Sequence, residues 1–197
     1  MPDDRRASLV AAVHARLDRA RRAGDPAELL GPAGDWDIVG LTALLDEDAE
    51  DLEAHWLLGS LHWHRGTAGG DADEVGAAVE RFTVCFVNGI DDLPDILLPV
   101  LAQRAAPFAV QLLQEAAAGG DPALVRALVG VWQRITAAGP DDPDPALCHN
   151  NLAIAHQLRL DLAGDPADLD AAVVASETAV AASDDSHPQR GAFLLLR

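Results

Sequence analysis

The sequence predicts an all-α fold in which about four antiparallel helical hairpins stack into a solenoid. A Gly-Asp phrase returns four times, beginning at Gly24, Gly70, Gly120 and Gly164, so that its copies lie 46, 50 and 44 residues apart. A recurrence of roughly 20–50 residues is typical of stacked repeats. Helical periodicity runs through most of the chain. The composition, 49% hydrophobic but only 4% aromatic, favours a core of alanine, leucine and valine.

The Gly-Asp phrase has the composition of a helix boundary. Glycine adopts the left-handed conformation that closes a helix, aspartate caps the next helix, and proline suits the first helical turn. Three copies carry an acid three residues after the capping aspartate, namely Glu28, Glu74 and Asp168. We expect these acids to stabilise the helix N-terminus, the glutamates also by completing a capping box. No GxGxxG or GKS/GKT pattern accompanies the glycines, so they do not indicate a nucleotide site.

The helices on both sides of the phrase repeat as well. After the fourth copy, residues 169–180 place apolar or small side chains at helical spacing, and the same stripe occurs at 75–86 and 125–136. Before the phrase, residues 54–68 align with 148–162 at an offset of 94. Each unit is therefore predicted to be a helical hairpin. The same offset pairs histidines of the two segments: His55 with His149, and His62 with His156.

The predicted organisation is a single repeat domain over residues 1–197, with units at roughly 1–47, 48–90, 91–140 and 141–186, and with 187–197 opening a further helix. In the first unit, a Gly-Pro-Ala-Gly segment interrupts the second helix, and Asp35 is predicted to cap a short replacement that contains Trp36. Pro107 is predicted to kink or divide the first helix of the third unit. Because the chain ends in an unpaired Phe-Leu-Leu-Leu run, we expect the natural reading frame to continue beyond Arg197.

The charge of the chain excludes one class of partner and leaves another open. A net charge of −18 would repel nucleic-acid phosphates over most of the surface, so no nucleic-acid partner is expected. The basic residues are uneven, because six of the 14 lie within the first 22 residues. We interpret this basic first helix as a solvated end helix, with contact to an anionic partner as the alternative.

Membrane, catalytic and metal functions are not expected. No stretch reaches the roughly 18 uninterrupted apolar residues of a membrane span, and the N-terminus is not a secretory signal, which favours a cytoplasmic protein. Cys85 lies on a predicted core stripe, and no HExxH or GxSxG pattern is present, so no enzyme is predicted. The side chains of His62 and His64 point about 200° apart around a helix. We therefore interpret the histidines as structural and expect neither a metal nor a cofactor.

Two of the units resemble tetratricopeptide repeats. The resemblance rests on Leu58-Gly59 followed by Ala78, Phe82 and Cys85, and on Leu152-Ala153 followed by Ala172, Ser176 and Ala179. In that family a small residue of the first helix packs against the second helix, and the repeats form a right-handed α-solenoid. The units here are longer, and they are similar to the long repeats of multidomain bacterial, often actinobacterial, proteins. The resemblance implies an interaction array, often joined to an effector such as a CHAT caspase-like peptidase.

The resemblance also implies where a partner would bind. The first helices of such repeats line a concave groove, which gives six candidate groove residues: Trp56, Ser60 and Trp63 in the second unit, and Asn150, Ile154 and Gln157 in the fourth. We expect a non-catalytic protein-protein interaction or regulatory domain that presents this groove to a peptide or protein. The alternatives are a small-ligand sensor controlling an attached effector and, last, an independent enzyme.

Overall fold

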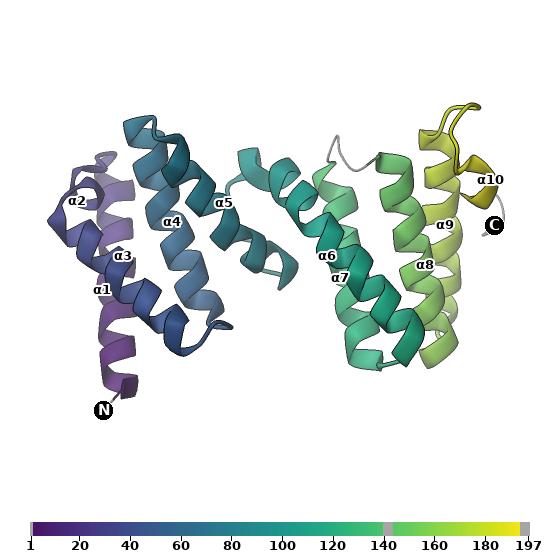
Figure 1. Cartoon of the computed structure of the whole chain (residues 1–197), viewed down its shortest axis with the longest axis horizontal. Coiled ribbons are helices and arrows are strands. Elements are labelled where there is room, and N and C mark those ends of the chain that lie inside the picture. The colour runs from purple at the N-terminus through teal and green to yellow at the C-terminus, as the bar shows by residue number, and fades with distance from the viewer. Residues whose placement is uncertain (1, 140–143, 194–197) are drawn as a thin grey trace. The chain divides into compact units, whose positions relative to one another are not determined.

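The computed structural model describes residues 2–139 and 144–193, and all regular secondary structure in those ranges is helical (Figure 1). The all-α prediction is confirmed. Contacts between residues divide the chain into two compact units, an N-terminal unit (Met1–Cys85) and a C-terminal unit (Phe86–Arg197). We describe each unit by itself.

The N-terminal unit is built from four helices and most of a fifth. They are α1 (Pro2–Ala23), α2 (Ala27–Leu30), α3 (Pro32–Glu47), α4 (Leu52–Gly69) and α5 (Ala72–Val87). Helices α1, α2, α3 and α4 together form a core that includes these fully buried aliphatic side chains: Val13, Leu17, Leu29, Leu41, Leu57 and Leu61. Burying one such side chain stabilises the fold by roughly 1.5–3 kcal/mol.

Helices α4 and α5 approach closely at a glycine. A Cβ atom built on Gly59 would lie 2.8 Å from two ring carbons of Phe82, which is closer than real Cβ contacts allow. Phe82 is itself buried to 1% exposure. The pair of small and large residues that the sequence places at these positions is therefore in direct contact.

The C-terminal unit begins with a short 3₁₀ helix (Asp95–Leu97) and continues with four long helices that lie side by side, each antiparallel to the next (Figure 1). These are α6 (Leu98–Gly119), α7 (Pro122–Ala138), α8 (Pro145–Ala163) and α9 (Pro166–Ala182). Their core includes Leu101, Leu128, Trp132, Ile135 and Ala155, each fully buried.

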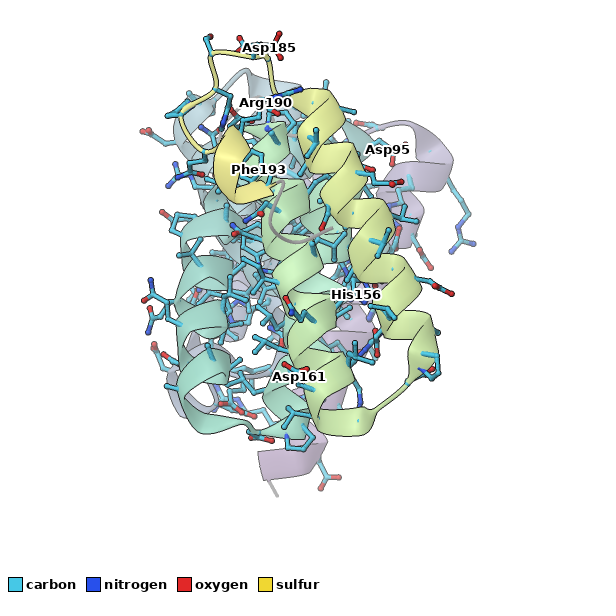
Figure 2. The ribbon with its side chains drawn as sticks, turned by 90° about the vertical axis from the view of Figure 1, so that its right-hand side faces the viewer. Asp95, His156, Asp161, Asp185, Arg190 and Phe193 are labelled. Atoms are coloured by element: carbon cyan, nitrogen blue, oxygen red, sulfur yellow. The ribbon has the colours of Figure 1, made fainter. Side chains whose placement is uncertain are left out.

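A short helix, α10 (Arg190–Phe193), closes the end of α9. Figure 2 shows Arg190 and Phe193 of α10 beside the C-terminal end of α9. The Arg190 guanidinium donates hydrogen bonds to the carbonyl oxygens of Val180 and Ser183, at 2.9 and 2.5 Å, and Phe193 is 1% exposed. The predicted further helix at 187–197 is thus represented by α10, and its last four residues lie outside the described ranges.

The Gly-Asp phrase ends one helix and caps the next, as predicted. Gly70, Gly120 and Gly164 adopt left-handed backbone conformations with φ of 67°, 65° and 70°. Asp121 and Asp165 then accept hydrogen bonds from the amides of Ala123 and Ala167, at 2.8 and 3.0 Å. The glycine that ends one helix and the aspartate that caps the next are therefore both supplied by the phrase itself.

The acid three residues after the capping aspartate lies in the first turn of its helix, as predicted, and it also binds an arginine nine residues earlier, on the preceding helix. The capping box predicted for Glu28 and Glu74 does not form, because the amides of Asp25 and Asp71 donate to Ala20 and Gly66 instead. The three pairs, which we call the hairpin locks, are Arg19 with Glu28, Arg65 with Glu74, and Arg159 with Asp168. A guanidinium within reach offers charge-assisted hydrogen bonds, which are stronger than the interaction of an acid with a helix dipole.

Two of the locks also contain a histidine twelve residues before the acid. His62 Nδ1 lies 2.5 Å from Glu74 Oε2, and His156 Nδ1 lies 2.8 Å from Asp168 Oδ1. Figure 2 places His156 on α8, on the side that faces α9. These histidines belong to the repeat, as the offset of 94 indicates, and their function is to join the two helices of a hairpin. The third copy has Leu124 and Glu115 at the lock positions instead of an acid and an arginine.

The first unit departs from prediction in one respect. Helix α3 begins at Pro32, not after Asp35, and it runs for 16 residues, so it is not a short replacement. Proline is well suited to a first helical turn. A Cβ atom at Gly34 would lie 2.1 Å from the Leu29 carbonyl oxygen, so glycine lets the start of α3 pass tightly against α2.

Helix α6 is continuous through Pro107, which therefore does not divide it. By length and composition alone, the segment Asp95–Gly119 resembles a membrane span, with a mean hydropathy of 1.5 over its most apolar 18 residues. A third of that window is buried inside the protein, and core helices of soluble proteins have the same composition. The observation is weak evidence for a membrane segment.

Candidate functional site

The first three predicted groove residues lie on α4, and helix α1 covers part of them. The Trp56 ring stacks on the imidazole of His14, with centroids 5.6 Å apart, and the Arg21 guanidinium carbon lies 5.7 Å from the Trp56 ring centroid. Ser60 is only 3% exposed, and Trp63 is half-buried. Trp56 therefore helps to pack α1 against α4, whereas Trp63 retains an accessible part.

The other three predicted groove residues lie on α8 in the C-terminal unit. Asn150 is 8% exposed, and its Oδ1 atom has no hydrogen-bond partner among the described residues. Ile154 is half-buried and Gln157 is exposed. Each trio thus offers one residue with substantial accessible surface.

A surface that sequence reasoning missed lies on α3. Trp36 is 74% exposed and Val39 is 59% exposed, although both are large apolar side chains. They follow each other at helical spacing and continue to Ala43, Asp46 and Glu47 near the end of the helix. We call Trp36, Val39, Ala43, Asp46 and Glu47 the α3 outer stripe.

The opposite face of α3 is packed against the rest of the N-terminal unit. It contains Leu41 and Leu45 together with Asp37, which is 5% exposed. The Asp37 carboxylate accepts a hydrogen bond from Arg16 Nε at 2.6 Å. The inward face of α3 thus carries this ion pair together with apolar side chains, and Trp36 lies on the opposite face.

The outer stripe is acidic at its C-terminal end. No basic residue occurs in α3. Asp46 and Glu47 occupy its last turn, where the helix dipole disfavours negative charge, and neither has an ion-pair partner among the described residues. Asp35, at the other end, accepts a hydrogen bond from Arg65 at 2.8 Å. The stripe therefore combines an exposed indole ring with unneutralised carboxylates.

A hollow of about 270 Å³ lies where the end of α1 meets α4. We call it the α1–α4 hollow; it is lined by Ala20, Arg21, Gly24, Asp25, Pro26, Leu29, His64, Thr67 and Ala68. Burial first, and the nearby Arg21 charge second, lower the pKa of the His64 imidazole below its usual value. A lowered pKa keeps His64 neutral at pH 7, so that one of its ring nitrogens carries a proton to donate.

The described residues provide no obvious catalytic or metal site. Burial raises the pKa of the Cys85 thiol to about 12, so the reactive thiolate is scarce at neutral pH. Its Sγ atom lies 3.8 Å from the Leu52 carbonyl oxygen, which accepts its weak hydrogen bond. Within residues 2–139 and 144–193, no three His, Cys, Asp or Glu side chains are grouped to hold a metal ion.

Together, these features define the chain as an all-α protein with two candidate binding surfaces, the α3 outer stripe and the α1–α4 hollow. No protein-family model, curated protein or solved structure gives a significant match to the chain. Its function is therefore argued from these surfaces alone.

Proposed function

We propose that this chain is a non-catalytic protein-interaction domain and that its partner docks on the α3 outer stripe. The observation that carries the proposal is the exposure of Trp36, at 74%, beside Val39, at 59%. Tryptophan is enriched among the residues that dominate binding energy, and exposed apolar patches mark interaction sites. Burying about 150 Å² of such a ring would contribute roughly 4 kcal/mol before the entropic cost of association.

The charges of the stripe select the chemistry of the partner. Asp46 and Glu47 lie beyond the apolar residues on the same side of α3 and have no basic neighbour on that helix. A complementary segment therefore carries an apolar row followed by arginine or lysine. An amphipathic helix or an extended peptide with this pattern would place its apolar side chains on Trp36 and its cations against the two carboxylates.

The predicted groove residues of α4 in the N-terminal unit, and separately those of α8 in the C-terminal unit, are further candidate surfaces for the same class of function. Their support is the accessible part of Trp63 and the exposed Gln157, while Trp56 is engaged with α1. The proposal of tetratricopeptide-like hairpins draws support from the Gly59–Phe82 contact and from locks that recur at the same offset of 94. A small-ligand sensor is the alternative function, and the α1–α4 hollow is the feature that favours it.

Selection of peptides from a random display library on the full chain tests the proposal. We expect enriched peptides to combine apolar and basic residues, and to bind the Trp36→Ala variant about 30-fold more weakly, the loss expected when a hot-spot contact of about 2 kcal/mol is removed. Val174→Ala is the control, because this valine is 62% exposed in the other unit.

The outcome separates the α3 outer stripe from the predicted groove residues on α4. Loss of binding in Trp63→Ala but not in Trp36→Ala would transfer the interaction to the predicted groove. Equal binding by the wild type and both tryptophan variants would contradict both surfaces. Enrichment of acidic peptides in place of basic ones would contradict the charge argument.

A further inference from the structure

The α1–α4 hollow contains an arginine that makes no ion pair with the described residues. Of the five other arginines of α1, all but Arg5 have carboxylate partners within 4 Å: Arg6 with Asp51, Arg16 with Asp37, Arg19 with Glu28, and Arg22 with Asp18. The Arg21 side chain makes no ion pair or hydrogen bond with the described residues. Arg21 differs from the other unpaired arginines in lining this hollow together with His64.

The position of Arg21 is restricted by an aromatic ring. Its guanidinium carbon lies 5.7 Å from the centroid of the Trp56 ring, which itself stacks on His14. A cation placed over an indole loses part of its rotational freedom in advance. Arg21 also lines the hollow, so an oxygen anion bound there would meet a guanidinium that has already lost part of its freedom.

His64 contributes a second donor to the same hollow. It lies on α4, and its ring nitrogens make no hydrogen bond with the described residues. Asp25 also lines the hollow, but its Oδ1 atom accepts the amide hydrogen of Ala27 at 2.9 Å, so that carboxylate already holds the loop backbone. The donors of Arg21 and His64 are thus left available.

The hollow has the size of a small binding site. Its volume is about 270 Å³, and a second recess of about 410 Å³ shares Ala20 and Asp25 with it. Arg19 and Arg22 line that second recess, while Glu28 limits its charge. An anionic group held in the first recess would have room beside it for the remainder of a ligand.

We propose that the α1–α4 hollow binds the oxyanion group, carboxylate or phosphate, of a small ligand through Arg21 and His64. This site is separate from the α3 outer stripe and does not depend on the proposed protein-interaction function. Arg21 supplies charge-assisted hydrogen bonds, and His64 supplies one neutral N–H donor. The two sources of an oxyanion are distinguished by testing a phosphate and a dicarboxylate separately.

The test is titration of the full chain with inorganic phosphate and with succinate at constant ionic strength, followed by calorimetry and by the NMR resonance of His64. We expect saturable binding of one or both anions, with a shift of the His64 resonance. Arg21→Gln should weaken that binding at least about tenfold, the loss expected for a hydrogen bond to a charged group. His64→Gln should weaken it by a smaller factor, because the donor lost is neutral.

Arg22→Gln is the matched control. It removes the same charge from the same turn of α1, but Arg22 does not line the 270 Å³ hollow. We expect its affinity to change less than about twofold, because screened surface charges act weakly at a distance. Equal weakening by Arg21→Gln and Arg22→Gln would indicate diffuse attraction and overturn the proposal, as would the absence of saturable binding by both anions.

The Arg21→Lys variant tests whether the weaker binding of Arg21→Gln results only from lost packing on Trp56. Lysine keeps the charge and the cation–π contact but lacks the planar fork. An affinity between those of the wild type and Arg21→Gln, with an unchanged melting temperature, supports the proposal. Full affinity in Arg21→Gln would overturn it whatever the melting temperature.

Discussion

The three hairpin locks place the same ion pair at three degrees of burial, which gives a graded test of what the locks contribute. The acid side chains are 51% exposed at Glu28, 21% at Glu74 and 3% at Asp168. Substitution of each acid by its neutral isostere, Glu28→Gln, Glu74→Gln and Asp168→Asn, removes the charge with little change in shape. We expect the loss in the free energy of unfolding to be smallest for Glu28→Gln, larger for Glu74→Gln and largest for Asp168→Asn.

The magnitudes follow from the burial of the partners. Arg19 and Glu28 are both about half exposed, so Glu28→Gln should cost less than about 1 kcal/mol. Asp168 contacts Arg159 and His156, of which the histidine is 5% exposed. Removing one partner of a fully buried pair costs about 3–5 kcal/mol, but Arg159 is 35% exposed and keeps part of its hydration, so we expect Asp168→Asn to cost roughly 2–4 kcal/mol. Glu74→Gln should fall between these values, at roughly 1–3 kcal/mol.

Native-state hydrogen exchange is the suitable assay, because the chain has two units and a single melting curve would average them. We expect Asp168→Asn to lower the protection of α8 and α9 amides and Glu74→Gln to lower that of α4. A cost for Asp168→Asn no greater than that for Glu28→Gln would refute the reasoning, since burial would then have no influence on the lock.

Three further predictions concern acid stability, packing and thiol reactivity. The hydrogen bond from Arg159 holds the pKa of Asp168 below its usual value. The stability that the Asp168 carboxylate contributes is therefore present above about pH 4 and is lost as the pH falls through its native pKa. Urea midpoints measured from pH 6 to 2 should fall less steeply in Asp168→Asn than in the wild type. Gly59→Ala should destabilise the N-terminal unit by about 1–3 kcal/mol through overpacking against Phe82, whereas Gly76→Ala, with no neighbour within 4 Å, should be neutral or stabilising, and thermal melts of both variants measure the difference. Cys85 should react with a thiol reagent far more slowly in the native protein than in urea, because burial raises its pKa to about 12; equal rates would contradict its burial.

The elements that the sequence predicted well depend on local chemistry. The left-handed glycines and the capping aspartates act within a few residues, and the phrase contains all the groups involved. The lock was missed although its spacing is present in the sequence. An acid near a helix start has several competing partners, and only the packing of the preceding helix brings Arg65 to Glu74.

The candidate surfaces were harder to predict for a related reason. Helix α3 has two apolar stripes, one through Leu41 and one through Trp36, and helical periodicity alone does not decide which faces inward. In the folded unit the face with Leu41 packs inward, where Asp37 also pairs with Arg16, 21 residues earlier in the chain. The importance of Arg21 likewise depends on which of its neighbours are already paired, and that is a property of the folded unit.

The third Gly-Asp copy lacks a hairpin lock, and this difference predicts the order in which the hairpins separate as the pH falls. The hairpin of α6 and α7 has Leu124 and Glu115 where the others have an acid and an arginine, and Glu115 accepts its hydrogen bond from Gln111 on its own helix. Protonation of carboxylates therefore removes an interhelical bond from the other three hairpins but not from this one. As the pH falls, we expect α6 and α7 to remain as a helical remnant after α8 and α9 have separated.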